Sequence, residues 1–162
     1  MPLATLALLA ATACSNVLLV APAGMQAISP PVADPVPLPV QLTWTEPEAS
    51  IQAQIDRGER YYVVFVNRPP IAPGASLASL VGDECEGATG CPDQAYFAEL
   101  GVYVTAQPQL LLVRLVDQRT SERAGAADRH VATVVIADDR GVRDGEIAAS
   151  IPFVVERESA DG

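Results

Sequence analysis

Short runs of β-branched and aromatic residues recur along this chain from Val40 onward, and residues that form turns separate them. Residues 41–45 alternate polar and apolar side chains, and residues 60–66 are largely aromatic or β-branched. Runs of similar character follow at residues 102–105, 110–116, 130–136 and 146–155. Strands favour such side chains and end at turn-forming residues. We therefore expect an all-β domain of about six or seven short strands, which favours a two-layer β-sandwich.

Local signals add a hairpin and a helix. The last two runs flank residues 138–141, Asp-Asp-Arg-Gly, a turn sequence that predicts a hairpin. Pro152 places the final strand at a sheet edge or a bulge, because proline has no N–H to donate to a neighbouring strand. Residues 92–100 predict a short helix, since Pro92 stands in its first turn and Gly101 follows as a stop.

Residues 49–56 fit two structures. Ile51, Ala53 and Ile55 alternate as in a strand, but Ile51 and Ile55 also lie one helical turn apart. Because Arg57-Gly58 and the aromatic run follow at once, we favour a strand here.

The sequence contains three cysteines, Cys14, Cys85 and Cys91. Cys85 and Cys91 bracket a short segment with two glycines, which allow the tight turn that a disulfide needs. A zinc site is the alternative, but the spacing is not that of zinc ligands, and the single histidine, His130, is far away in sequence. We therefore expect a disulfide between Cys85 and Cys91, which leaves Cys14 to be explained.

Residues 3–13 form an uncharged, largely apolar segment that ends in small residues immediately before Cys14, and Ser15 follows. This segment resembles a bacterial lipoprotein signal, although it lacks a basic start and has Ala11 where that pattern prefers leucine. The resemblance implies that residues 1–13 are a signal peptide and that Cys14 carries a lipid anchoring the protein to a membrane. Ser15 would then permit sorting to an outer membrane, so the expected location is the cell envelope, at the outer membrane or the cell surface.

Two other interpretations of this segment stay open. An ordinary secretory signal cleaved after Ala21-Pro22-Ala23 would give a secreted protein. The apolar stretch also approaches the roughly 20 residues that span a membrane, although Asn16 and Pro22 interrupt such a span.

The rest of the chain divides by composition. Residues 14–39 contain the lipid attachment site and a proline-rich stretch, which predicts an extended, semi-rigid tether. Residues 40–157 are expected to form the sandwich domain, which is long enough for an adequate core. Residues 158–162 are expected to be a disordered tail.

The formal net charge is −10 and all ten cations are arginine. Nucleic acid requires a basic face on its partner, so we do not expect this protein to bind it. The sequence contains no motif of serine hydrolases, zinc proteases, phosphate-binding loops or dinucleotide sites. His130 opens a predicted strand, where a histidine is more often structural than catalytic. We expect no enzymatic activity, no cofactor and no metal site.

Acidic residues near the cysteines offer one alternative to this view. Asp83, Glu84, Glu86 and Asp93 could gather around Ca²⁺, which prefers oxygen ligands. They do not match an EF-hand loop, and acidic loops are usually only solvated. A calcium- or carbohydrate-binding domain therefore stays an alternative, although few aromatic side chains are available to stack on a sugar.

Residues 42–47, Leu-Thr-Trp-Thr-Glu-Pro, precede the Tyr/Val-rich run at 61–65. This arrangement resembles the B and C strands of fibronectin type III and related immunoglobulin-like modules, in which a core tryptophan precedes a proline-bearing loop and a Tyr/Val-rich strand. The resemblance implies an immunoglobulin/fibronectin-III-like β-sandwich, with residues 69–101 as a long insertion that contains the disulfide and the short helix. A transthyretin-like sandwich, as in the lipoprotein component of type VI secretion systems, is the second choice.

Residues 67–74 have the best claim to binding a partner. Their three prolines restrict the backbone and lower the entropy cost of presenting side chains. Arg68 can bind carboxylates or phosphates through two hydrogen bonds, and Ile71 offers an apolar contact, so Asn67, Arg68 and Ile71 are the candidate contact residues. The alternative is a stiff crossover that only caps the core. We expect a non-enzymatic envelope lipoprotein that binds a protein partner or forms a structural part of a larger envelope assembly.

Overall fold

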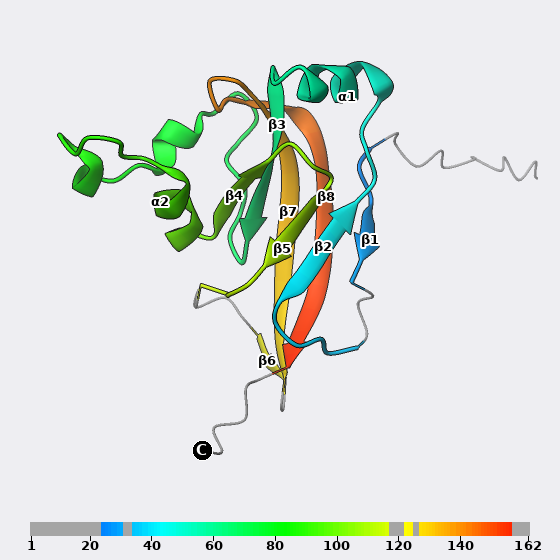
Figure 1. The fold of residues 1–162 in the computed structure, drawn as a ribbon. Helices are drawn as coiled ribbons and strands as arrows, with labels where there is room; N and C mark the ends of the chain where they lie inside the picture. The colour runs from blue at the N-terminus through cyan, green and yellow to red at the C-terminus, as the bar shows by residue number, and fades with distance from the viewer. Residues whose placement is uncertain (1–23, 31–33, 117–121, 125–126, 157–162) are drawn as a thin grey trace, which may run out of the picture.

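The computed structural model describes residues 24–30, 34–116, 122–124 and 127–156 (Figure 1). In chain order the elements are β1 (Ala27–Ser29), β2 (Val40–Trp44), α1 (Ala49–Asp56), β3 (Arg60–Val66), η1 (Leu77–Leu80), η2 (Asp83–Cys85), α2 (Gln94–Glu99), β4 (Val102–Thr105), β5 (Gln109–Leu112), β6 (Glu122–Ala124), β7 (Ala127–Asp138) and β8 (Arg143–Glu156). The described chain is mostly β-strand with few helices, so the all-β prediction is confirmed at this level.

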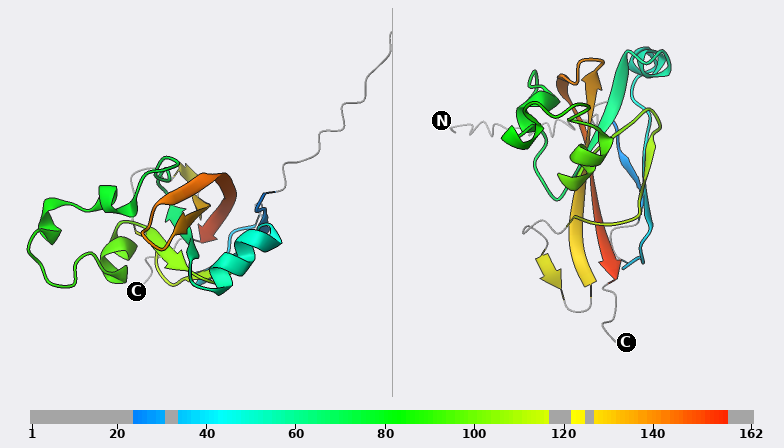
Figure 2. Two further views of the ribbon diagram at one scale, coloured as in Figure 1. Left: turned by 90° about the horizontal axis from the view of Figure 1, so that it is seen from above. Right: turned by 60° about the vertical axis from the view of Figure 1, so that its left-hand side comes forward.

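The strands form two antiparallel sheets with a shared core between them (Figures 1 and 2). The smaller sheet has the order β1-β2-β5. In the larger sheet β3 lies between β4 and β7, and β8 pairs with β7 on the side opposite β3. β6 pairs with the first residues of β7. The chain therefore crosses between the sheets after β2, after β4 and again after β5.

Alternating side chains of β2 and β3 fill the core between the sheets. Leu42 and Trp44 point inward from β2, and Tyr62 and Val64 point inward from β3. The rings of Trp44 and Tyr62 meet edge to face, with centroids 5.3 Å apart. Because successive side chains of a strand face opposite sides, the remaining apolar residues of β3 must be covered on the other face of the larger sheet.

The insertion at residues 67–101 provides that cover and forms a second core, which we call the outer core. Val63 and Phe65 of β3 pack there with Ile71 and Leu77 of the insertion. Figure 2 shows the insertion and the smaller sheet on opposite sides of the larger sheet. The domain thus has three layers, and the larger sheet contributes to both cores.

Several predictions from the sequence are confirmed. β3 and β4 have the predicted bounds, and α2 lies within the predicted helix at 92–100. β7 and β8 form the predicted hairpin, with its turn at residues 138–141. Pro152 lies in β8, which is an outer strand of the larger sheet, as the proline indicated.

Residues 49–56 form the helix α1, so the prediction of a strand here is wrong. Ile55 is buried in the core between the sheets, and Ile51, one turn earlier, packs against the same core. The hydroxyl of Tyr62 donates to Gln52 Oε1 at 2.7 Å and ties the helix to β3. The apolar spacing fits both periods, and only these tertiary contacts decide between them.

The predicted tether at residues 14–39 also needs correction, because its last part belongs to the sandwich. Met25 is 4% exposed and lies in the core, and β1 pairs with β2. The N–H of Val36 donates to Val154 O at 3.0 Å, and its carbonyl accepts from Glu156 at 3.0 Å, so this segment adds to the free edge of β8. Proline-rich chain is extended, and extended chain can pair at a sheet edge; composition alone does not reveal the pairing.

Candidate interaction site in the insertion

Asn67 ends β3 and opens the insertion with a positive φ of 55°. Its backbone N–H donates to the carbonyl of Val131 at 2.9 Å, and its side-chain oxygen accepts the N–H of Val131 at 3.3 Å. The side-chain nitrogen then faces His130, with Nδ2 and Nδ1 2.8 Å apart. Asparagine tolerates the left-handed conformation better than most residues. Asn67 therefore turns the chain out of the sheet and also fixes it to β7.

His130 is held inside the fold by this amide. Because Asn67 Nδ2 is the donor, His130 Nδ1 accepts the hydrogen bond, and the neutral ring has its proton on Nε2. The imidazole is 8% exposed and stacks on Phe153, with ring centroids 5.3 Å apart. His130 is thus a buried, hydrogen-bonded side chain of the sandwich.

Arg68 and Ile71, the other two predicted contact residues, also make internal contacts. Arg68 is half-buried, and its Nη1 donates to the carbonyl of Leu100 at 2.9 Å, which joins the start of the insertion to its end. Ile71 is 8% exposed and lies in the outer core. Its side chain is therefore not available as the apolar partner contact expected from the sequence, because the larger sheet already covers it. A stiff crossover that caps a core accounts for both contacts.

Arg143 of β8 joins this crossover to the larger sheet through side-chain and backbone hydrogen bonds. It is 8% exposed, and its Nη1 donates to the carbonyl of Ile71 at 2.7 Å. The backbones also pair, since Gly74 donates to the Arg143 carbonyl and Arg143 donates to the carbonyl of Ala75, both at 2.9 Å. The sequence gives no signal of this role, because arginine is mostly exposed in proteins and no neighbour of Arg143 marks it as buried.

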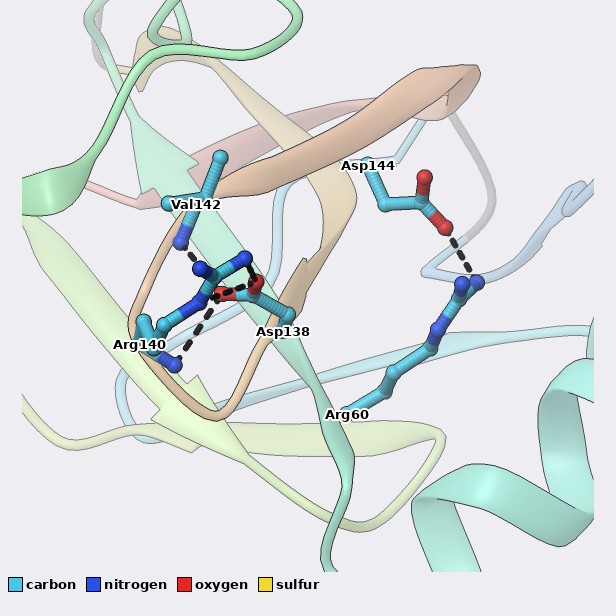
Figure 3. A network of polar contacts seen from close by, with 5 residues as sticks. All are labelled: Arg60, Asp138, Arg140, Val142 and Asp144. Atoms are coloured by element: carbon cyan, nitrogen blue, oxygen red, sulfur yellow. Dashed lines mark hydrogen bonds and ion pairs between the residues drawn. The ribbon is translucent and has the colours of Figure 1, made fainter.

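The turn of the β7–β8 hairpin is stiffened where the insertion attaches (Figure 3). Asp138 accepts hydrogen bonds from the side chain of Arg140 and from the N–H of Val142, the latter at 2.8 Å. These bonds hold the pKa of Asp138 below its usual value. Arg60 of β3 forms an ion pair with Asp144 of β8 beside the turn.

The exposed tip of the insertion is the disulfide loop at residues 83–91. Cys85 and Cys91 lie at disulfide distance, with their Cα atoms 5.3 Å apart. The hydroxyl of Tyr96 donates to Glu84 Oε1 at 2.8 Å, so α2 holds this loop in place. Hydrogen bonds from its own backbone N–H and from Tyr96 lower the pKa of Glu84. The Tyr96 hydrogen bond thus favours the ionised form of Glu84.

The acidic residues considered for calcium do not form a metal site in the described part of the chain. No group of three or more His, Cys, Asp or Glu side chains in the described part of the chain is arranged to hold a metal ion. Asp93, one of the acidic residues considered for calcium, instead caps α2 by accepting the N–H of Tyr96 at 2.8 Å. The segment at 1–13, Cys14 and the tail at 158–162 lie outside the described residues.

None of the helices that the structure describes is long and apolar enough to cross a membrane.

These contacts tie residues 67–101 to the larger sheet as a layer whose outer surface carries both apolar and acidic residues. Pro69 and Pro73 are exposed along the crossover, and the acidic disulfide loop is exposed at the tip. Glu84, which Tyr96 holds in place, would lose little entropy when a partner binds it. Comparison with protein-family models, with curated proteins and with solved structures found no match.

Proposed function

We propose that this protein is a lipid-anchored, non-enzymatic component of a bacterial cell envelope that presents its insertion to a protein partner. The arrangement of the cysteines carries the proposal. Cys85 and Cys91 lie at disulfide distance, which leaves Cys14 as the remaining one of three cysteines. Cys14 follows the apolar segment that resembles a lipoprotein signal. A disulfide belongs to an oxidising compartment, and such a signal would deliver the chain to one.

The domain is proposed to be of the fibronectin type III or immunoglobulin-like type. β2, which contains Trp44, lies in one sheet with β1 and β5, and the next strand, β3, lies in the other sheet with β7 and β8. In immunoglobulin folds strands A, B and E likewise share one sheet, and C, F and G share the other. The place of β4 beside β3 corresponds to strand C′ of the variable-type domains. This strand order supports the resemblance carried by residues 42–47 and 61–65.

The charge of the insertion indicates the chemistry of its partner. The one cation of the insertion, Arg68, is half-buried and donates to the carbonyl of Leu100. Residues 69–101 contain no basic residue, and their acidic residues are Asp83, Glu84, Glu86, Asp93 and Glu99. A partner that docks on the tip would match this charge with a basic surface, because interfaces pair complementary potentials.

Fractionation of cells that produce Cys14→Ala tests the anchor. We expect the wild-type protein in the membrane fraction and the variant either released or left unprocessed, while globomycin causes the precursor to accumulate. The double variant Cys85→Ser/Cys91→Ser is the control, because it removes two thiols and keeps Cys14. If Cys14→Ala stays in the membrane with the same processing as wild type, the lipid-anchor proposal is wrong.

Charge reversal tests the partner surface separately. Asp83→Arg/Glu86→Arg changes the exposed tip, and Glu48→Arg changes an exposed residue just before α1 as the control. We expect the tip variant to lose proteins that co-purify with the wild type from membranes, with no change in melting temperature beyond a few degrees. Full retention of those proteins would exclude the tip as the contact surface.

A further inference from the structure

β5 is an outer strand of the smaller sheet, and no strand in the described part of the chain pairs with its second edge, which we call the free edge. The exposed side chains of β5 are Gln109 and Leu111. Leu111 is 56% exposed, and Val113, just after the strand, is 68% exposed. Proteins usually protect such edges with charge, proline or a covering segment, because an open edge pairs readily with another strand. From residue 101 to residue 116 the sequence contains no acidic residue, and the one cation there, Arg114, forms an ion pair with Glu99.

The register of β5 determines which of its backbone groups are free. Gln109 lies opposite Thr43, and the N–H of the next residue of β2, Trp44, donates to the carbonyl of Pro108 at 3.1 Å. In an antiparallel pair this pattern makes Gln109 a member of a non-hydrogen-bonded pair. Leu111, two residues further, has the same orientation. The N–H and C=O groups of Gln109 and Leu111 therefore point away from β2, along the free edge.

We propose that this edge is a dimer interface in which β5 pairs antiparallel with β5 of a second copy of the chain. Leu110 then lies on the two-fold axis. The backbone of Gln109 in one copy exchanges two hydrogen bonds with the backbone of Leu111 in the other, and by symmetry Leu111 of the first copy exchanges two with Gln109 of the second. The free groups of one copy thus complement the same groups of another, as a two-fold interface requires. The smaller sheets join into one continuous sheet across the axis.

The distribution of charge favours a second copy at this edge. A net charge of −10 opposes the approach of two copies, so a contact between them costs least where negative charge is absent. The tip at residues 83–91 is acidic, so two tips would repel each other. At the edge of β5 the residues that would face each other, Gln109 and Leu111, are both uncharged. The proposal does not depend on the lipid anchor, although attachment to one membrane would raise the local concentration of the chain.

Sedimentation velocity of the full chain in detergent, over a series of protein concentrations, tests the proposal. The variant is Leu111→Glu and its matched control is Ile28→Glu, because Ile28 is 59% exposed on β1, the opposite outer strand of the same sheet. Both substitutions put the same charge on an exposed apolar position. We expect wild type and Ile28→Glu to dimerise with equal Kd, and Leu111→Glu to raise the Kd by more than about tenfold.

Hydrogen exchange provides a second readout on the backbone itself. The amide of Leu111 should be protected in concentrated wild-type protein and exchange rapidly when the sample is diluted. A wild type that stays monomeric at every concentration, or an equal response of the two variants, overturns the proposal. A photo-crosslinker at Val113 that captures only a different protein in cells also overturns it, because the edge would then accept a strand of another chain.

Discussion

Truncation of Ile71 tests whether the insertion is an integral layer of the fold. Ile71 is 8% exposed and packs in the outer core against β3. Ile71→Val should lower the free energy of unfolding by about 1 kcal/mol and Ile71→Ala by about 3 kcal/mol, because truncation of buried isoleucine leaves a cavity as well as losing burial. For a domain of this size the alanine variant should melt roughly 6–12 °C lower.

Urea unfolding followed by the fluorescence of Trp44 is the sharpest assay, because the single tryptophan lies in the other core, between the sheets. Alternate residues of β3 face the two cores, so loosening of the outer core should destabilise both. We expect the Trp44 transition to shift by the full amount in Ile71→Ala. Ile28→Ala, at an exposed site, is the control and should stay within about 0.5 kcal/mol of wild type. If the Trp44 transition of Ile71→Ala does not move, the three-layer arrangement is refuted.

Three further predictions follow from single sites. Asn67→Ala and Asn67→Gly both lose the side-chain bonds to β7 and keep the backbone bond to Val131, but only alanine is strained at φ 55°. Chemical denaturation should therefore find Asn67→Ala about 1 kcal/mol less stable than Asn67→Gly, and equal stabilities would contradict the strained turn. Burial of the hydroxyl raises the pKa of Tyr62 to about 12, and the negative charges of Glu46 and Asp56 add to this shift. The neutral hydroxyl therefore contributes its full stabilisation below about pH 10, and this stabilisation is lost as the pH rises through 12. In denaturation curves between pH 10 and pH 12, the free energy of unfolding of wild type should fall by about 2 kcal/mol more than that of Tyr62→Phe. Equal losses would refute the burial of that hydroxyl. Thiol labelling of unfolded, non-reduced chain should leave Cys85 and Cys91 unmodified, and labelling of both would exclude the disulfide.

The sequence predicts strands well where one period dominates the pattern. β3 is a continuous aromatic and β-branched run, and the hairpin has an unambiguous turn, so both are found where expected. α1 is missed because Ile51 and Ile55 satisfy the helical and the strand period at once. β1 is missed because proline-rich chain has no apolar alternation, and its pairing with β2 depends on partners that lie more than ten residues away.

The candidate site is predictable only in part, and for a related reason. The sequence correctly marks residues 67–74 as conformationally restricted, but a single apolar residue between prolines has no periodicity that tells which way it faces. Ile71 is therefore assigned to the surface although it is buried. The role of Arg143 depends on a carbonyl 72 residues away, and no local pattern encodes that contact.

The mass of the N-terminal peptide of mature protein, isolated from membranes, tests the proposed envelope function most directly. A lipid-anchored protein gives a peptide that begins at Cys14 and carries the mass of a diacylglyceryl group. A free N-terminus at Gly24, or a peptide with an unmodified Cys14, would contradict the anchor and with it the proposed function.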